Sequence, residues 1–475
     1  MGREISTSEY LDETEFQTRL RDETKLVMGW FRDHAFENPH PTKIGLELEA
    51  WLVDKDGFPS PRNEEFLKRV DNPLVVPELA AFNFEINGEP EALSGRVFSQ
   101  IEKQLRTIWD EACVSANTLG LDALMIGIPA TLRQDMLTLD SMTPSNRYQL
   151  LNDRLFQMRN GQPLHIDIDG RDSLEMVQDH LMLEAACTSL QVHLMLNQEN
   201  SARSYNAAQI ASAPLVAISA NAPFLYGRRL WEETRIPAFE EAINLPGYRD
   251  RSGRKAGRVT FGTQYLRQSM MELFLENLDG YTPFLPMCSD DAPDKLTHLR
   301  LQNGTIWRWN RPIIQPAENG QPHLRLENRV IPAGPTLVDM VANMAFFIGL
   351  TLYLRDIDDL EERLLFESAR KNFYSCAKKG LSAEIDWLDG KTGNVQTLIS
   401  TQMAEQAQEA LVAHGVDALE AGHYMNIIKS RARNGQTGSA WQRAHANCHG
   451  RDFQKLVQDY LVLQNEGLPV HGWRV

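Results

Sequence analysis

The sequence Ile44-Gly-Leu-Glu-Leu-Glu-Ala-Trp-Leu52 decides the fold that we expect for this chain. Apolar residues occupy every second position from Ile44 to Leu52, which is the pattern of a β-strand with one face in the core. Glu47 and Glu49 then point together from the opposite face. The stretch therefore predicts a strand that places a pair of carboxylates on one face of a sheet.

The alternation of this strand recurs along the chain, mixed with helical periodicity. Period-two runs lie at 43–53, 82–87, 190–196, 298–302, 305–311 and 323–330. Helical periodicity is found near 8–36, 94–119, 145–159, 173–188, 205–220, 263–278 and 336–366. Turns at Asn303-Gly304 and Asn319-Gly320 would join the runs within 298–330 into consecutive strands. The mixture predicts an α+β fold with a largely antiparallel sheet, followed by a helical and polar region after residue 376.

The length of 475 residues suits either about three average domains or one large sheet-based domain. We divide the chain into an N-terminal helical extension (1–38), a main domain that contains the sheet (39–375) and a helical C-terminal region packed on it (376–475). Two apolar stretches, 207–225 and 340–354, are candidates for membrane spans. The first contains prolines and polar residues and the second is too short for a bilayer, so we interpret both as buried helices.

The composition excludes several classes of partner. A net charge of −16 argues against a nucleic acid or an anionic membrane as the main partner. The five cysteines are scattered and form no C-x-x-C pair, which is typical of reduced thiols in a cytosolic protein. The first residues lack an apolar signal core, so we expect a cytoplasmic location. The P-loop, Rossmann and H-E-x-x-H signatures are absent from the sequence.

The polar residues of the alternating runs are the candidates for chemistry. Besides Glu47 and Glu49 they include Glu85, Gln191 and His193, and a later run that carries Arg325, Glu327 and Arg329 on one face. One interpretation is that each polar face is simply solvated, as in many half-buried antiparallel sheets. The other is that the faces line one concave surface.

If they do line one surface, like charges lie close together and need a cation, because a partly buried ion without compensation costs roughly several kcal/mol. Carboxylates with one imidazole suit Mg²⁺ or Mn²⁺ better than zinc, and the arginines would then hold an anionic substrate or a phosphate. His165, Asp167 and Asp169 also alternate before Gly170, where a hairpin turn is favoured over a metal loop.

A series of motifs in a fixed order joins these runs, at 44–49, 78–90, 142–148, 187–193, 220–224, 304–312 and 326–329. In this order they resemble the glutamate–cysteine ligase superfamily, which includes the bacterial carboxylate–amine ligases and the plant-type enzymes. The motifs are similar to its G-x-E-x-E first strand, its second acidic strand, its M-P-x-x-R-Y segment, its Q-V-H strand, its A-N-S-P-F segment and its closing G-T-I-x-W-x-x-R-P and E-x-R pair. The resemblance spans residues 44 to about 350.

The resemblance implies a glutamine-synthetase-like fold, shared with guanidino kinases, in which helices cover the convex side of a curved antiparallel sheet and the active site lies in its concave face. It implies ATP and Mg²⁺, or Mn²⁺, as cofactors. The implied metal ligands are Glu47, Glu49, Glu78, Glu85, His193 and Glu327. The implied catalytic residues are Glu327, Arg329 and Arg311, and the implied substrate-binding residues are Arg147, Gln191 and Tyr148.

The function that the resemblance implies is an ATP-dependent carboxylate–amine ligase that acts through an acyl phosphate. Glutamate and cysteine are the default substrates, which would place the enzyme in glutathione biosynthesis, with small molecules rather than macromolecules as partners. Two alternatives stay open: a scaffold that binds ATP or an amino acid without ligation, and a phosphotransferase on the same fold. Asn328 departs from the apolar residue common in E-x-R, and the insert at 160–180 and the tail after 376 have no counterpart. The identity of the acid and the amine, the general base and the oligomeric state, a homo-oligomer included, therefore stay open.

Overall fold

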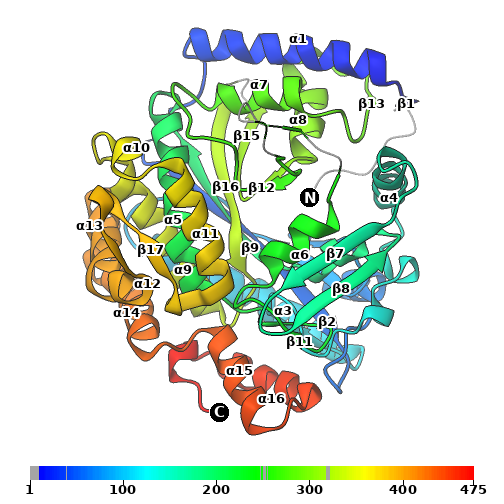
Figure 1. The fold of residues 1–475 in the computed structure, drawn as a ribbon, viewed down its shortest axis with the longest axis vertical. Coiled ribbons are helices and arrows are strands. Elements are labelled where there is room, and N and C mark those ends of the chain that lie inside the picture. The colour runs from blue at the N-terminus through cyan, green and yellow to red at the C-terminus, as the bar shows by residue number, and fades with distance from the viewer. Residues whose placement is uncertain (1–9, 39, 246–247, 250–252, 254, 317–320) are drawn as a thin grey trace.

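The structure is a computed structural model that describes residues 10–38, 40–245, 248–249, 253, 255–316 and 321–475 (Figure 1). Its centre is a curved antiparallel sheet with the strand order β15-β16-β9-β2-β4-β3, and β5 and β6 also pair with β2. The strands are β2 (Lys43–Val53), β3 (Val75–Pro77), β4 (Asn83–Asn87), β5 (Glu91–Ala92), β6 (Asp122–Leu124), β9 (Ser189–Leu196), β15 (Asn310–Pro316) and β16 (Pro322–Pro332). The expected α+β fold with a curved antiparallel sheet is confirmed.

Alternation along the strands separates the two faces of this sheet. The apolar residues of β2 lie in the core. On β15 and β16, Asn310 and Asn328 face helix α5 (Ser201–Ser219): Asn328 Nδ2 donates to Asn310 Oδ1 at 2.9 Å, and Asn310 Nδ2 donates to Ser212 Oγ at 2.9 Å. The polar residue at position 328 is thus explained by a buried hydrogen-bonded layer. Arg311 and Glu327 lie at the alternate positions and face away from α5.

The helices surround this sheet, and α5 and α9 pack against each other beside it (Figure 1). Their bounds, apart from that of α5, are α1 (Glu13–Arg32), α2 (Asn63–Val70), α3 (Val97–Thr118), α4 (Asn146–Met158), α6 (Arg235–Ala242), α7 (Met271–Gly280), α8 (Thr297–Gly304), α9 (Leu337–Arg355), α10 (Leu360–Arg363), α11 (Phe366–Lys379), α12 (Val395–Leu398), α13 (Ala404–Ala413), α14 (Ala418–Asn434), α15 (Gly438–Cys448) and α16 (Phe453–Glu466). Of the described helices, α9 is long and apolar enough to cross a membrane, but 94% of its apolar window is buried inside the protein. The interpretation of 207–225 and 340–354 as buried helices is confirmed for the helical parts of both stretches.

Short strand pairs complete the fold. They are β1 (Tyr10–Leu11) with β13 (Met287–Cys288), β7 (Leu164–Asp169) with β8 (Ser173–Gln178), β10 (Phe224–Leu225) with β11 (Arg228–Arg229), β12 (Val259–Thr260) with β14 (Trp307–Arg308), and β17 (Glu384–Asp386) with β18 (Thr392–Asn394). The pair β7–β8 confirms the hairpin turn expected at Asp169-Gly170. It also shows that the helix expected at 173–188 is wrong, because residues 173–178 pair with β7 and only 181–186 form a short 3₁₀ helix.

The strand expected at 298–302 is wrong as well, and so is the turn at Asn303-Gly304, because both belong to α8. The side chain of Glu23 in α1 fixes the start of this helix: its two oxygens bind His298 Nδ1 at 2.6 Å and the Leu299 N–H at 2.7 Å. That partner lies far away in sequence and leaves no local signal. The run at 305–311 is divided between β14 and β15, and the turn at Asn319-Gly320 lies outside the described residues.

The three-part division of the chain stays a prediction. The N-terminal helix α1 packs on α7 and α8, and α13 and α14 pack on α9 (Figure 1). Helix α11 runs through the expected boundary at 375/376. The region after 376 is mainly helical, as expected, apart from the hairpin β17–β18.

A buried ion pair ties this C-terminal region to α9. Arg431 Nη2 lies 2.7 Å from Asp339 Oδ1, and Asp339 Oδ2 accepts the Val470 N–H at 2.9 Å. We expect Asp339→Ala to lower the free energy of unfolding by about 3–5 kcal/mol, because it leaves the buried charge of Arg431 without a carboxylate and with only the neutral acceptors of Asn343 and Ile218. Denaturant unfolding followed by circular dichroism measures this loss.

The control for this substitution is Asp389→Ala, which removes an exposed partner of Arg363 at 2.7 Å. Exposed pairs are screened by water, so we expect a much smaller loss of stability there. Equal losses for the two variants would show that burial of the first pair does not anchor the C-terminal region.

Candidate active site

The face of the sheet opposite α5 carries two groups of potential metal ligands. In the first group Glu47, His193 and Glu327 come from β2, β9 and β16, and one ligand atom of each lies within 4.8 Å of the others. The strand register explains this, because His193 lies opposite Glu327 in β16 and opposite Gly45 in β2, two positions from Glu47 on the same face. His193 Nε2 is 3.2 Å from Glu47 Oε1 and 3.9 Å from Glu327 Oε1.

Two arginines hold Glu327 in place. Arg311 forms a bidentate pair with it, with Nε to Oε2 at 2.6 Å and Nη2 to Oε1 at 2.7 Å, and Arg329 Nη1 lies 3.2 Å from Oε2. Burial alone would raise the pKa of Glu327, but these two positive charges outweigh it and lower the pKa below its usual range. The carboxylate is therefore ionised at neutral pH. Burial alone would also raise the pKa of Glu47. The contact with His193 outweighs the effect of burial, so the pKa of Glu47 is lowered.

The second group consists of Glu49, Glu78 and Glu85, all buried, with one oxygen of each within 4.8 Å of the others. Glu49 lies directly opposite Glu85 across the β2–β4 pair. Glu49 accepts hydrogen bonds from the Ser189 N–H at 2.7 Å and from Gln191 Nε2 at 2.8 Å. Among the described residues, no hydrogen-bond donor reaches Glu78 Oε1, although this atom is buried.

The charges of the second group are poorly compensated. Burial raises the pKa of Glu78 well above its ordinary value, and the neighbouring carboxylates Glu85 and Glu49 raise it further. Burial also raises the pKa of Glu49, despite the opposing charge of Arg329. Close buried carboxylates of this kind call for a cation.

Gln191 links the two groups. Its Nε2 donates to Glu49, and its Oε1 accepts from Arg329 Nη1, which also contacts Glu327. The six expected metal ligands thus lie on one face of the sheet, in two clusters joined by an amide and a guanidinium. Glu47 and Glu49 share a face but belong to different groups.

The remaining expected site residues lie at the start of α4. Ser145 caps this helix by accepting the Arg147 N–H at 3.2 Å. Tyr148 is buried, which raises the pKa of its hydroxyl, and the charges of Glu78 and Glu184 raise it further. Tyr148 therefore lies near the second group, and Arg147 is its neighbour in the first turn of the helix.

The donor atoms fit a divalent cation of the magnesium type. Both groups are rich in carboxylate oxygens, the ligands that hard cations prefer, and the first group also contains one imidazole. Glu78 Oε1 and His193 Nδ1 are buried and lack a hydrogen-bond partner among the described residues. The residues present therefore suit Mg²⁺ or Mn²⁺ better than a structural zinc.

Arg325 was a candidate for chemistry without an assigned role, and Glu184 and Arg235 were missed as site residues. Burial lowers the pKa of the Arg325 guanidinium, against the opposing charges of Glu47 and Glu327. Its position on the same face of β16 as Glu327 was the available sequence signal. Burial raises the pKa of Glu184 to about 7, and Glu49 adds to the effect; no spacing signal marked this residue. Arg235 Nη1 and Nη2 donate to the Val330 and Arg329 carbonyls at 3.2 and 3.3 Å, and nothing in its local sequence indicated that role.

Comparison with known proteins places this arrangement in a family. The family model described as glutamate-cysteine ligase family 2 matches residues 43–459. The chain belongs to glutamate-cysteine ligase family 2. The suspected resemblance is thereby confirmed, and the match extends through most of the C-terminal helices as well as the sheet. A comparison with curated protein sequences finds no significant match.

Solved structures show the same fold at low sequence identity. A glutamate–cysteine ligase from Francisella tularensis, solved in complex with AMP, has a TM-score of 0.54 and 11% identity over 93% of this chain and 91% of that chain. A bifunctional glutathione synthetase from Pasteurella multocida has a TM-score of 0.55 and 12% identity over 96% of this chain and 54% of that chain. This chain thus spans about half the length of the Pasteurella protein. At these identities the likeness establishes the fold.

Proposed function

We propose that this protein is an ATP-dependent carboxylate–amine ligase that forms an amide through an acyl phosphate, with glutamate and cysteine as its substrates. The observation that carries the proposal is the pair of carboxylate groups on one sheet face, joined by Gln191 and Arg329. Membership of a ligase family supports the reaction class, and the AMP in the Francisella relative supports a nucleotide site.

The chemistry explains why such a site is useful. A carboxylate is a poor acyl donor, because its leaving group would be oxide. In the proposed reaction a substrate carboxylate oxygen attacks the γ-phosphorus of ATP and ADP leaves. The amine then attacks the acyl carbon, phosphate leaves, and the amine loses a proton. Phosphoryl transfer depends on positioning and on neutralising charge.

In this proposal the six acidic and imidazole residues hold Mg²⁺, or Mn²⁺, in two groups: Glu47, His193 and Glu327 form one, and Glu49, Glu78 and Glu85 the other. Bound divalent ions supply positive charge against the triphosphate. Arg329 and Arg311, fixed by Glu327, stabilise the phosphoryl group during transfer. Arg147, Gln191 and Tyr148 bind the substrates.

The cysteines and the proposed substrates bear on where the protein works in the cell. Two of the five free cysteines, Cys288 and Cys376, are buried, and no disulfide forms, which supports a reducing, cytoplasmic location. Glutamate and cysteine as substrates would place the enzyme in glutathione biosynthesis. The polar, metal-binding character of the face supports small-molecule substrates.

Phosphate release from ATP with Mg²⁺, measured with and without a panel of amino acids, tests the proposal. We expect release that requires both glutamate and cysteine, with an amide product. Release that is independent of amino acids, or no release, would contradict the ligase assignment. A phosphorylated product without an amide would establish the phosphotransferase alternative.

Arg147 provides a separate test of substrate binding. We expect Arg147→Ala to raise the KM for one substrate about tenfold or more, because a charge-assisted hydrogen bond to an anion contributes about 1.5–3 kcal/mol. Metal affinity should stay nearly constant. Steady-state kinetics and Mn²⁺ titration measure the two effects, and unchanged kinetics would remove Arg147 from the site.

A further inference from the structure

A cavity lies apart from the carboxylate groups, and none of its lining residues belongs to them. It has a volume of about 510 Å³, which is within the range of small-molecule sites. Segments that are distant in sequence form it: the turn after β7, the residues after β11, the end of α11 with the residues that follow, one residue of α12, and the stretch from the end of α14 into α15. Figure 1 shows these segments approaching one another near the C-terminal helices.

The lining of this cavity is cationic, although the protein as a whole is strongly acidic. Arg171, Lys378, Lys379 and Arg443 line it, and Glu232 is the one carboxylate among the lining residues. Helix α15 adds to the positive potential, because its N-terminus lies at the cavity, where Thr437 caps it.

The nearby carboxylates compensate only part of this charge. Glu232 Oε2 pairs with Arg443 at 2.9 Å, and Asp169 Oδ2 pairs with Lys378 at 3.1 Å. No ion pair to a carboxylate is found for Arg171 or Lys379 within the described part of the chain.

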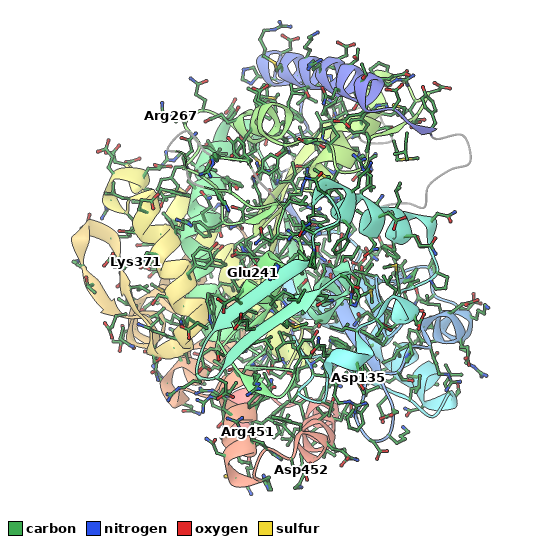
Figure 2. The ribbon with its side chains drawn as sticks, turned by 45° about the vertical axis from the view of Figure 1, so that its right-hand side comes forward. Asp135, Glu241, Arg267, Lys371, Arg451 and Asp452 are labelled. Atoms are coloured by element: carbon green, nitrogen blue, oxygen red, sulfur yellow. The ribbon has the colours of Figure 1, made fainter. Side chains whose placement is uncertain are left out.

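A further pair involves Asp172, the residue after Arg171: Arg451 contacts it at 3.1 Å, and Figure 2 labels Arg451 near the C-terminal helices. The surplus of positive charge also affects the pKa of Arg229. Its partial burial lowers the pKa of its guanidinium, and the repulsion from Arg443, Arg171 and Arg451 lowers it further, against the attraction of Glu232. Arginines that repel one another around a cavity are stabilised when an anion enters it.

We propose that this cavity is a binding site for a small polyanion, a molecule that carries at least two phosphate or carboxylate groups. Arg443 and Arg171 supply the planar guanidinium groups that suit such groups, and Lys379 supplies a mobile point charge. The site is separate from the proposed ligase reaction, and its test does not depend on that reaction.

Hydrogen bonds and an ion pair connect one wall of the cavity to the sheet. The Glu232 and Glu233 N–H groups donate to the Lys378 and Ala377 carbonyls at 3.3 and 2.9 Å. Glu233 pairs with Arg235, which in turn binds the carbonyl of Arg329. One wall of the cavity is therefore continuous with the segment that supports the carboxylate face.

Isothermal titration calorimetry tests the proposal with the full chain freed of metal on a chelating resin, because the absence of divalent ions prevents metal-dependent binding at the carboxylate groups. The probes are inorganic pyrophosphate and citrate. We expect saturable binding of at least one of them, weakened at least tenfold by Lys379→Glu and by Arg443→Ala, and weakened by salt. Tighter binding of pyrophosphate identifies a phosphate site, and tighter binding of citrate identifies a carboxylate site.

The matched control is Lys103→Glu, which makes the same change in net charge at an exposed position of α3 that does not line the cavity. Its affinity for either probe should equal that of the wild type. Lys379 makes no ion pair with a described carboxylate, so its replacement does not remove a structural contact of that kind. Absence of binding by the wild type, or equal loss in Lys379→Glu and Lys103→Glu, would overturn the proposal.

Discussion

Replacing Glu327 by glutamine is expected to reduce turnover by at least about 100-fold, the size of effect seen when one preorganised charge is removed from an active site. Glu327 is the residue that the first metal group and both arginines share. Glutamine has nearly the same shape as glutamate but carries no charge, so Arg311 and Arg329 lose the carboxylate that they share. Phosphate release under saturating substrates measures the loss in kcat.

The control for Glu327→Gln is Glu276→Gln. Glu276 also pairs with a buried arginine, Arg308, at 2.8 Å, but lies outside both metal groups. Both variants remove one carboxylate charge from a buried arginine, and circular dichroism should show that both are folded. We expect near-normal turnover for Glu276→Gln. If Glu327→Gln retained comparable activity, its assignment to the catalytic site would be wrong.

Replacing Glu78 by glutamine is expected to have opposite effects with and without metal. The pKa of Glu78 is raised above its ordinary value of 4.5 by burial and by Glu85 and Glu49. The unfolded chain therefore loses this proton at a lower pH than the folded chain, and metal-free stability falls as the pH rises above that value. Without metal at pH 7.5, Glu78→Gln should raise the free energy of unfolding by about 1–3 kcal/mol.

With saturating Mn²⁺ the order should reverse, because the wild type gains binding energy that the variant has largely lost. Denaturant unfolding in EDTA and in Mn²⁺ measures both signs. Glu240→Gln is the control: burial raises the pKa of Glu240 to about 7, but this residue binds Trp309 and Tyr374 and belongs to neither metal group. Its effect on stability should be the same in both solutions. A Glu78 variant that behaves in the same way would remove Glu78 from the metal site.

The sheet could be predicted from the sequence because its strands carry their signal locally. Alternation in β2, β4, β9 and β16 fixes which side chains share a face, and neighbouring strands then bring Glu49 beside Glu85 and His193 beside Glu327. The division into two groups could not be predicted, because it depends on strand order and register. Those are set by contacts between distant parts of the chain.

The wrong sequence-based assignments at 298–302 and 173–188, and the two missed residues Glu184 and Arg235, have the same physical origin. His298 and Leu299 alternate like strand residues, yet Glu23 from α1 holds them in a helix. Residues 173–178 show helical spacing but pair with β7. Glu184 and Arg235 reach the site through tertiary packing, so no spacing rule marks them.

We propose above all that distant glutamates hold divalent cations at two adjacent places on one sheet face. A crystal structure with Mn²⁺ and a non-hydrolysable ATP analogue, with anomalous scattering recorded for manganese, tests it most directly. We expect one anomalous peak bounded by Glu47, His193 and Glu327, and another bounded by Glu49, Glu78 and Glu85. Full occupancy by the nucleotide with no manganese at either group would contradict the claim.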